Sequence, residues 1–155
     1  MNPGNEKMVR LIELIEQHTQ KEDFFLTPLG NFGVMRESHA HNKKPALYLP
    51  LIIIVGQGCK VCYAGNQIYE YGAGDLLVTL LPIPVKTEIV NASPEKPFLA
   101  AAAAIDLNRL SNMLLQIENA DRSAFQPVTV NPSSIFSTPA KDKLLDAFIR
   151  LLETL

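Results

Sequence analysis

LYLPLIIIVGQGCKVCYAGNQIYEYGAGDLLVTLL, residues 47–81, is the stretch that decides the fold. It consists of short segments rich in β-branched and aromatic residues, which is the composition of β-strands. Glycine-containing turns at residues 56–58, 65–66 and 72–75 separate these segments. The pair Gly65-Asn66 is typical of a tight hairpin turn. Short strands at this spacing predict an antiparallel sandwich or barrel.

The same texture extends on both sides of this stretch. The predicted strands are residues 33–36, 47–55, 59–63, 67–71, 76–81 and 85–90. Residues 47–55 are apolar on both faces, which predicts a central strand. Pro50 inside that strand predicts a bulge or a local edge, since proline cannot donate to a sheet ladder.

Residues 98–105 can be interpreted in two ways. They include five consecutive alanines, Ala100–Ala104, and alanine is the strongest helix former. One continuous helix from Leu99 to Ile117 is therefore possible. The alternative is a strand that leads into a new helix capped by Asp106. The local sequence leaves these two alternatives about equal.

Three helices are predicted around the strands. The first covers residues 5–20 with Asn5 as its N-cap, and the second begins after Asp106. Thr138 is predicted to cap the third, with Pro139 at its first position. Its apolar stripe is expected either to pack on its own domain or to form a dimer or domain-docking face. The stripe's candidate residues are Leu144, Leu145, Phe148, Leu151 and Leu152.

These elements predict three parts: an N-terminal helix and linker (residues 1–26), a β-barrel (27–105), and C-terminal helices that pack on the barrel (106–155). The last helix ends at Leu155 without a C-cap or a polar tail. We therefore expect more protein to follow this residue.

Charge and composition narrow the classes of function. The 155 residues are 47% apolar and 19% charged, with a net charge of −2, which is typical of a globular protein. The basic residues are scattered, so this chain is not expected to bind DNA phosphates itself. No signal peptide is evident, and the longest apolar run is far shorter than the roughly 20 residues of a membrane span. We expect a cytoplasmic, soluble protein with no membrane partner.

His39-Ala40-His41 is the most suggestive metal motif. Two histidines one residue apart share a face of a strand, and imidazole is a common metal ligand. However, Pro45 and Ala46 stand where a carboxylate ligand would be expected, and no third histidine follows. His39 and His41 are therefore interpreted chiefly as solvated loop residues, and no metal or other cofactor is predicted.

Other catalytic motifs are also weak. Cys59 and Cys62 form a C-x-x-C pair, but they open a strand rather than a helix, which favours ordinary reduced thiols over a redox pair. The sequence contains neither a G-x-S-x-G elbow nor a phosphate-binding loop. The chain is therefore predicted not to be an enzyme. The alternative is a metal-dependent cupin enzyme that uses His39 and His41.

A ligand pocket is expected in the mouth of the barrel, where such folds bind small molecules. Aromatic hydroxyls and one cation are the polar candidates, and small residues of the alanine segment would leave interior volume. The pocket candidates are Arg36, Tyr48, Tyr63, Tyr69, Ala101 and Ala103.

Taken together, the chain resembles the N-terminal domains of AraC-type transcription regulators. The resemblance lies in the order and spacing of several pieces. They are residues 27–29 (TPL), Arg36, 48–51 (YLPL), 54–60 (IVGQGCK), 65–75, 81–85 (LPIPV) and 92–99 (ASPEKPFL). One departure is the additional proline in Pro82-Ile83-Pro84, where the family often has a single proline.

The resemblance implies a cupin-like antiparallel β-barrel (a double-stranded β-helix or jelly roll) flanked by an N-terminal helix and two C-terminal helices, and it favours the strand for residues 98–105. It also implies binding of a small-molecule effector, formation of a homodimer, and DNA binding only through a helix-turn-helix domain outside this sequence. A dimerisation module without a ligand remains a further alternative.

Overall fold

The computed structural model describes residues 3–120 and 134–155. The helices are α1 (Pro3–His18), α2 (Leu107–Ala120) and α3 (Asp142–Glu153). The strands are β1 (Asp23–Leu26), β2 (Phe32–Glu37), β3 (His41–Tyr48), β4 (Leu51–Gln57), β5 (Cys59–Ala64), β6 (Gln67–Gly72), β7 (Asp75–Thr79), β8 (Ile83–Val90), β9 (Phe98–Ala104) and β10 (Ile135–Pro139).

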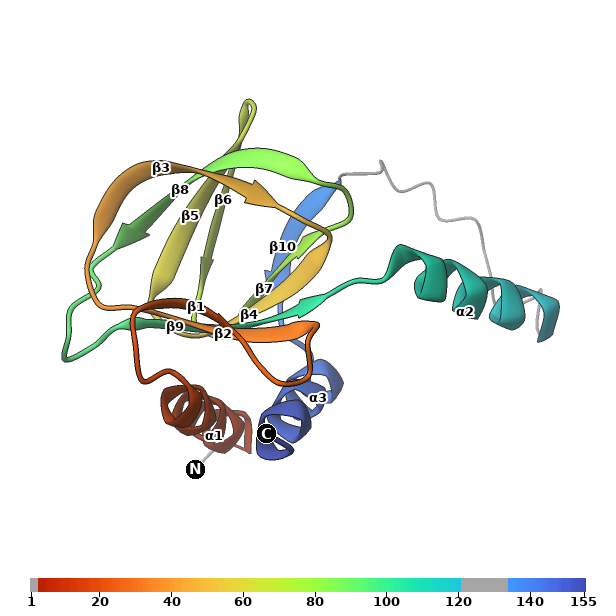
Figure 1. Ribbon diagram of the computed structural model, residues 1–155, viewed down its shortest axis with the longest axis horizontal. Coiled ribbons are helices and arrows are strands. Elements are labelled where there is room, and N and C mark those ends of the chain that lie inside the picture. Colours follow the sequence, from red (N-terminus) through yellow and green to blue (C-terminus); the bar gives the residue numbers. More distant parts are fainter. Residues whose placement is uncertain (1–2, 121–133) are drawn as a thin grey trace.

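Two antiparallel sheets face each other across a hydrophobic interior (Figure 1). The larger sheet has the strand order β1-β2-β9-β4-β7-β10, and the smaller has the order β3-β8-β5-β6. The predicted cupin-like β fold with flanking helices is confirmed. In the part of the chain that the structure describes, the two sheets share no strand, so the barrel is a sandwich with open edges.

A second hydrophobic layer lies on the outer face of the larger sheet. Helices α1 and α3 lie side by side against it (Figure 1). Leu11 and Ile15 of α1 and Phe148 and Leu152 of α3 are buried there. Each helix has one apolar stripe, so burial of that stripe against the sheet is the main source of its stability.

The alanine segment is a strand, β9, as the resemblance implied. It lies between β2 and β4, so Ala101 pairs with Val34 on one side and with Ile54 on the other. Asp106 begins a separate helix, and its Oδ1 accepts hydrogen bonds from the backbone N–H groups of Asn108 (3.0 Å) and Arg109 (3.1 Å). The prediction of Asp106 as an N-cap is therefore confirmed.

The single long strand predicted for residues 47–55 is wrong. The structure has two strands, β3 and β4, which belong to different sheets. Pro50 lies between them at the corner where the chain changes sheets. Its missing N–H group thus falls outside both ladders, whereas a bulge or a local edge within one strand was predicted.

The predicted start of the last helix is also wrong. Thr138 and Pro139 end strand β10, which pairs with β7, and Lys141 is the N-cap residue of α3. At the other end of the chain, α1 already includes Pro3, so Asn5 lies within its first turn rather than at its cap. Strand β1 was not predicted at all. It lies in the segment expected to be a linker, and it pairs with β2.

The two predicted C-terminal helices differ in their packing. Helix α3 packs against α1, whereas α2 projects away from both sheets (Figure 1). The predicted boundaries at residues 26 and 105 also cut through the larger sheet, because its edge strands β1 and β10 lie outside them. Among the described residues, no helix has the length and apolarity needed to cross a membrane.

Candidate functional site

A cavity of about 160 Å³ lies between the two sheets, and it is called the central cavity below. Strands β1, β2, β3, β4, β5, β6 and β9 all contribute to its walls. The lining residues are Phe24, Met35, Tyr48, Leu51, Ile53, Lys60, Tyr71, Phe98, Ala100, Ala101 and Ala102. The walls are almost entirely apolar, and among the lining residues one carries a charge, Lys60.

The small side chains of β9 make room for this cavity. Ala100 and Ala102 lie on the inner face of the strand, in the hydrophobic cluster between the sheets. Ala101 and Ala103 point the other way, toward the cluster beneath the helices, although Ala101 also borders the cavity. The predicted inward-facing alanines were Ala101 and Ala103, so the prediction is wrong by one residue. A shift of one residue exchanges the two faces of a strand.

Lys60 is the most unusual residue of the site. It lies on β5 opposite Tyr71 and Ile89, both of which are buried between the sheets, and it is only 5% exposed. Its ammonium group lies 3.6 Å from the sulfur of Met35 and 5.5 Å from the ring centre of Phe98. These are weak partners for a cation, and burial lowers the pKa of Lys60 because it penalises the charged form.

The only carboxylate that the structure pairs with this ammonium, among the described residues, belongs to Glu37. The distance from Lys60 Nζ to Glu37 Oε1 is 3.7 Å, which is an ion pair but longer than a hydrogen bond. The other Glu37 oxygen lies 3.1 Å from His41 Nε2, and His41 Nδ1 donates to the carbonyl oxygen of Asn42 at 2.7 Å. Glu37 therefore connects the cavity lysine to the corner between β2 and β3.

Two tyrosine hydroxyls supply further polar groups in the cavity wall. The hydroxyls of Tyr48 and Tyr71 are 3.0 Å apart and hydrogen-bonded to each other. Tyr71 is fully buried, and burial raises the pKa of both phenols. Both groups therefore stay neutral at physiological pH. One hydroxyl uses its proton in the bond between them, so the pair has one O–H group left to donate to a ligand.

The structure brings only part of the predicted pocket together. Tyr48 and Ala101 line the central cavity. Arg36 lies on the opposite face of β2 and pairs with Glu22 at 3.8 Å. Tyr63 lies on the outer face of the smaller sheet, where its hydroxyl donates to Glu88 and Lys43 stacks on its ring.

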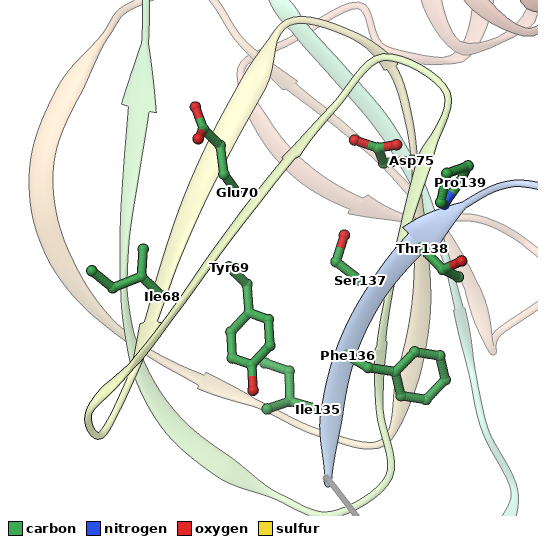
Figure 2. Close-up of a pocket in the computed structure, with 9 residues that line it drawn as sticks. All are labelled: Ile68, Tyr69, Glu70, Asp75, Ile135, Phe136, Ser137, Thr138 and Pro139. Carbon is green, nitrogen blue, oxygen red and sulfur yellow. The ribbon is translucent and has the colours of Figure 1, made fainter.

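Tyr69 borders a different hollow, an open groove between the edge strands β6 and β10 (Figure 2). Its ring lies beside Ile135, whereas its neighbours Ile68 and Glu70 point away (Figure 2). The groove marks the seam where the two sheets separate. It is wide and shallow, so it encloses a small molecule much less than the central cavity does.

The histidines and cysteines are not assembled into a site. His39 is exposed between β2 and β3, as predicted, but His41 is largely buried against Glu37, so the prediction of a solvated His41 is wrong. Among the described residues, no three potential ligands lie close enough together to hold a metal ion. Burial raises the pKa of both thiols, that of Cys62 to about 11, whereas a redox C-x-x-C pair needs a lowered pKa.

Lys60, Glu37 and Tyr71 were not among the residues predicted for the pocket. The sequence did contain a signal for Lys60. Residues two apart in a strand share a face, so Lys60 lies on the same face as the apolar residue Cys62, which is the inner face. Glu37 offered no such signal, since its role depends on a strand that is distant in the sequence.

Most of the predicted stripe of α3 is used inside the domain. Leu145, Phe148 and Leu152 are buried against α1 and the larger sheet, and Leu144 packs at the edge of the same cluster. Leu151 is exposed. The apolar face that remains exposed lies on α2 instead, and its residues are Leu107, Leu110, Met113, Leu114, Leu115 and Ile117.

Comparison with solved structures finds ToxT from Vibrio cholerae. A structure of ToxT at 1.65 Å resolution has a TM-score of 0.56 and 8% sequence identity, and the match covers 84% of this chain and 48% of ToxT. A complex of ToxT with (E)-4-(8-methylnaphthalen-1-yl)but-3-enoic acid has a TM-score of 0.56 and 9% identity, covering 86% and 48%. A ToxT structure with a bound unsaturated fatty acid has a TM-score of 0.51 and 8% identity, covering 87% and 48%.

The chain therefore spans about half the length of the solved proteins that it matches, and at this identity the likeness concerns the fold alone. A search of curated proteins found no significant match. The family model for the N-terminus of AraC-type transcriptional regulators matches residues 28–155, which include the whole cavity except Phe24. The chain belongs to the family of AraC-type transcriptional regulator N-terminal domains.

Proposed function

We propose that this domain senses a small monocarboxylate with an apolar body, which binds in the central cavity with its carboxylate at Lys60. The observation that carries this proposal is a lysine that is 5% exposed in an otherwise apolar cavity. A buried cation is costly unless an anion accompanies it. Glu37 offers only an ion pair at 3.7 Å, so a ligand carboxylate would add the charge-assisted hydrogen bonds that the ammonium lacks.

The neighbouring structures support the same ligand chemistry. The two ligands named for ToxT, an unsaturated fatty acid and a substituted butenoic acid, are both carboxylic acids with apolar bodies. In this chain, the apolar body would lie against Phe98 and the inward-facing alanines, and whichever hydroxyl of the Tyr48–Tyr71 pair keeps its proton free would donate to the second carboxylate oxygen.

A ligand can regulate only by binding two states of the domain unequally. A bound carboxylate would compete with Glu37 for Lys60 and so alter the contact from Glu37 to His41 at the corner of β2 and β3. We infer that this change passes to a DNA-binding domain outside this sequence. The protein would act in the cytoplasm as a regulator rather than as an enzyme.

Binding of hexanoate is expected to depend on Lys60. Isothermal titration should give a saturable heat with the wild-type protein, and Lys60→Met should weaken binding at least about tenfold because a charge-assisted pair contributes roughly 1.5–3 kcal/mol. Hexanol, which has no charge, should bind both proteins equally weakly. Equal hexanoate affinity of wild type and Lys60→Met would refute the role of Lys60 in binding.

We also propose that this chain forms a homodimer joined through the exposed apolar face of α2. Replacing Leu110 and Leu114 together with glutamate should convert the dimer into a monomer, because the two charges would be buried in the interface. Light scattering after size exclusion measures the mass, which for the monomer is 17.1 kDa. The control variant, Asn112→Glu with Gln116→Glu, adds the same charge on the polar face and should stay dimeric.

A further inference from the structure

A second apolar hollow of about 260 Å³ adjoins the central cavity at one end of the sandwich. It is called the vestibule, and its own lining includes Leu26, Gly30, Leu47, Leu49, Pro50 and Ala104. The vestibule and the central cavity share three lining residues, Phe24, Leu51 and Ala102. The two spaces are therefore neighbours separated by shared side chains.

The vestibule is lined by leucines although it is open to solvent. Leu26 and Leu47 are both 63% exposed, and Leu49 is 56% exposed. These residues come from β1, from β3 and from the corner before β4. Large exposed apolar side chains that gather from separate segments around a hollow mark a surface that a ligand or partner covers.

Phe24 stands between the two spaces. Its ring lies over Gly33, where an added Cβ atom would come within 2.1 Å of Phe24 Cζ, so only glycine leaves room for the ring in this position. Phe24 is 47% exposed and belongs to β1, a four-residue edge strand that pairs only with β2 among the described strands. A short edge strand opens at low free energy, so the ring can move more easily than the rest of the wall.

The volumes indicate why a ligand would occupy both spaces. The central cavity, at about 160 Å³, is close to an engineered cavity of roughly 150 Å³ that binds benzene. It falls below the roughly 300–1,000 Å³ of ordinary ligand pockets. With the vestibule added, the space enters that range. A carboxylate at Lys60 with a short chain fills the central cavity, and a longer chain has to pass Phe24.

We propose that the vestibule is a tail-binding subsite for long-chain monocarboxylates and that Phe24 sets the chain length admitted to it. This inference rests on the proposed function, since it assumes that the head group binds at Lys60. It assigns the selectivity for chain length to residues that do not contact the head group.

Titration calorimetry with hexanoate and dodecanoate, the latter below its micelle concentration, tests the subsite. Each buried methylene is worth roughly fourfold in Kd, so dodecanoate should bind wild type at least about a hundredfold more tightly than hexanoate. Leu49→Asp should weaken dodecanoate about tenfold and leave hexanoate unchanged. Its control, Leu81→Asp, changes a leucine of matching exposure (55%) outside the vestibule and should affect neither acid.

Phe24→Trp tests the role of Phe24, because the larger ring should obstruct the passage. Since Phe24 also lines the central cavity, the measured quantity is the preference for dodecanoate over hexanoate, which should fall about tenfold. Phe136→Trp makes the same change at a similarly exposed phenylalanine at the other edge of the sheet, and it should leave this preference unchanged. If hexanoate binding depends on Lys60 but dodecanoate binds no more tightly than hexanoate, the tail subsite alone is overturned. Failure of both acids to bind would instead overturn the proposed function.

Discussion

Replacing Phe148 with alanine is expected to lower the free energy of unfolding by about 3–5 kcal/mol. Phe148 is 1% exposed, and its ring centre lies 5.8 Å from that of Phe32 in the layer between the helices and the larger sheet. Removing the ring loses its transfer free energy and leaves a hole that α1 and the sheet can fill only in part. Since domains are stable by only about 5–15 kcal/mol, this loss is a large fraction of the total.

Urea denaturation followed by circular dichroism measures this effect. Leu151→Ala is the matched control on the same helix, because Leu151 is 38% exposed and should cost about 0.5 kcal/mol or less. Equal losses for Phe148→Ala and Leu151→Ala would mean that α3 does not pack on the sheet in solution. The stripe of α3 would then be free for a partner.

Replacing Glu37 with glutamine is expected to destabilise the unliganded domain by about 2–3 kcal/mol, somewhat below the roughly 3–5 kcal/mol for fully buried pairs. The variant leaves the Lys60 ammonium without a carboxylate, while the Glu37 side chain itself is 18% exposed and the pair is only partly buried. The double variant with Lys60→Met should regain most of this stability, because no unpaired charge then remains. If the double variant is as unstable as Glu37→Gln alone, the loss does not come from Lys60.

The pH dependence of stability gives an independent measure of the buried lysine. Burial lowers the pKa of Lys60 in the native domain below its usual value of 10.5, which it keeps in the unfolded chain. At a pH between the native and the unfolded pKa, the unfolded chain therefore binds more protons than the native domain. The free energy of unfolding should therefore rise with pH across that range, and the cost of burying the charge is fully present below it. Lys60→Met removes this contribution, so its stability advantage should shrink as the pH rises toward 10.5.

Comparing the two proteins at each pH is essential for this measurement. Burial raises the pKa of Cys62 to about 11 and raises that of Tyr48 as well. Both groups therefore lower the free energy of unfolding of the domain as the pH becomes alkaline. The contribution of Tyr48 is common to wild type and Lys60→Met and cancels in the difference. The charge of Lys60 also acts on the pKa of Cys62, so the two proteins are compared in a Cys62→Ala background. A difference that does not change between neutral pH and pH 10 would contradict a lowered pKa for Lys60.

Local patterns were sufficient for most of the β structure. Alternation of side chains and glycine turns located the strands that became β5, β6, β7 and β8. Asp106 was a sufficient signal for the start of α2, because its side chain caps the helix within three residues. The order and spacing of the motifs also identified the family.

Local patterns failed where a distant partner decided the outcome. Thr138 and Pro139 have the composition of a helix start, yet their backbone pairs with β7, about 60 residues earlier in the chain. Pro50 was similarly placed within a strand because the change of sheet at this corner has no local signature. In both cases the local conformational preference of a few residues is worth about 1 kcal/mol. Pairing with a distant strand in a sheet stabilises the chain by more than this preference.

The sequence by itself determined the class of fold and the family, because periodicity, turns and motif spacing depend only on neighbouring residues. The residues of the alanine segment alone left strand and helix open, and only the resemblance to the family favoured the strand. The tertiary structure gives the physical reason, since two neighbouring strands satisfy its backbone and its small side chains leave the cavity open. The same holds for the site. The chemistry of Lys60 arises from burial and from Glu37 on another strand, and neither is a property of the residues beside it in the chain.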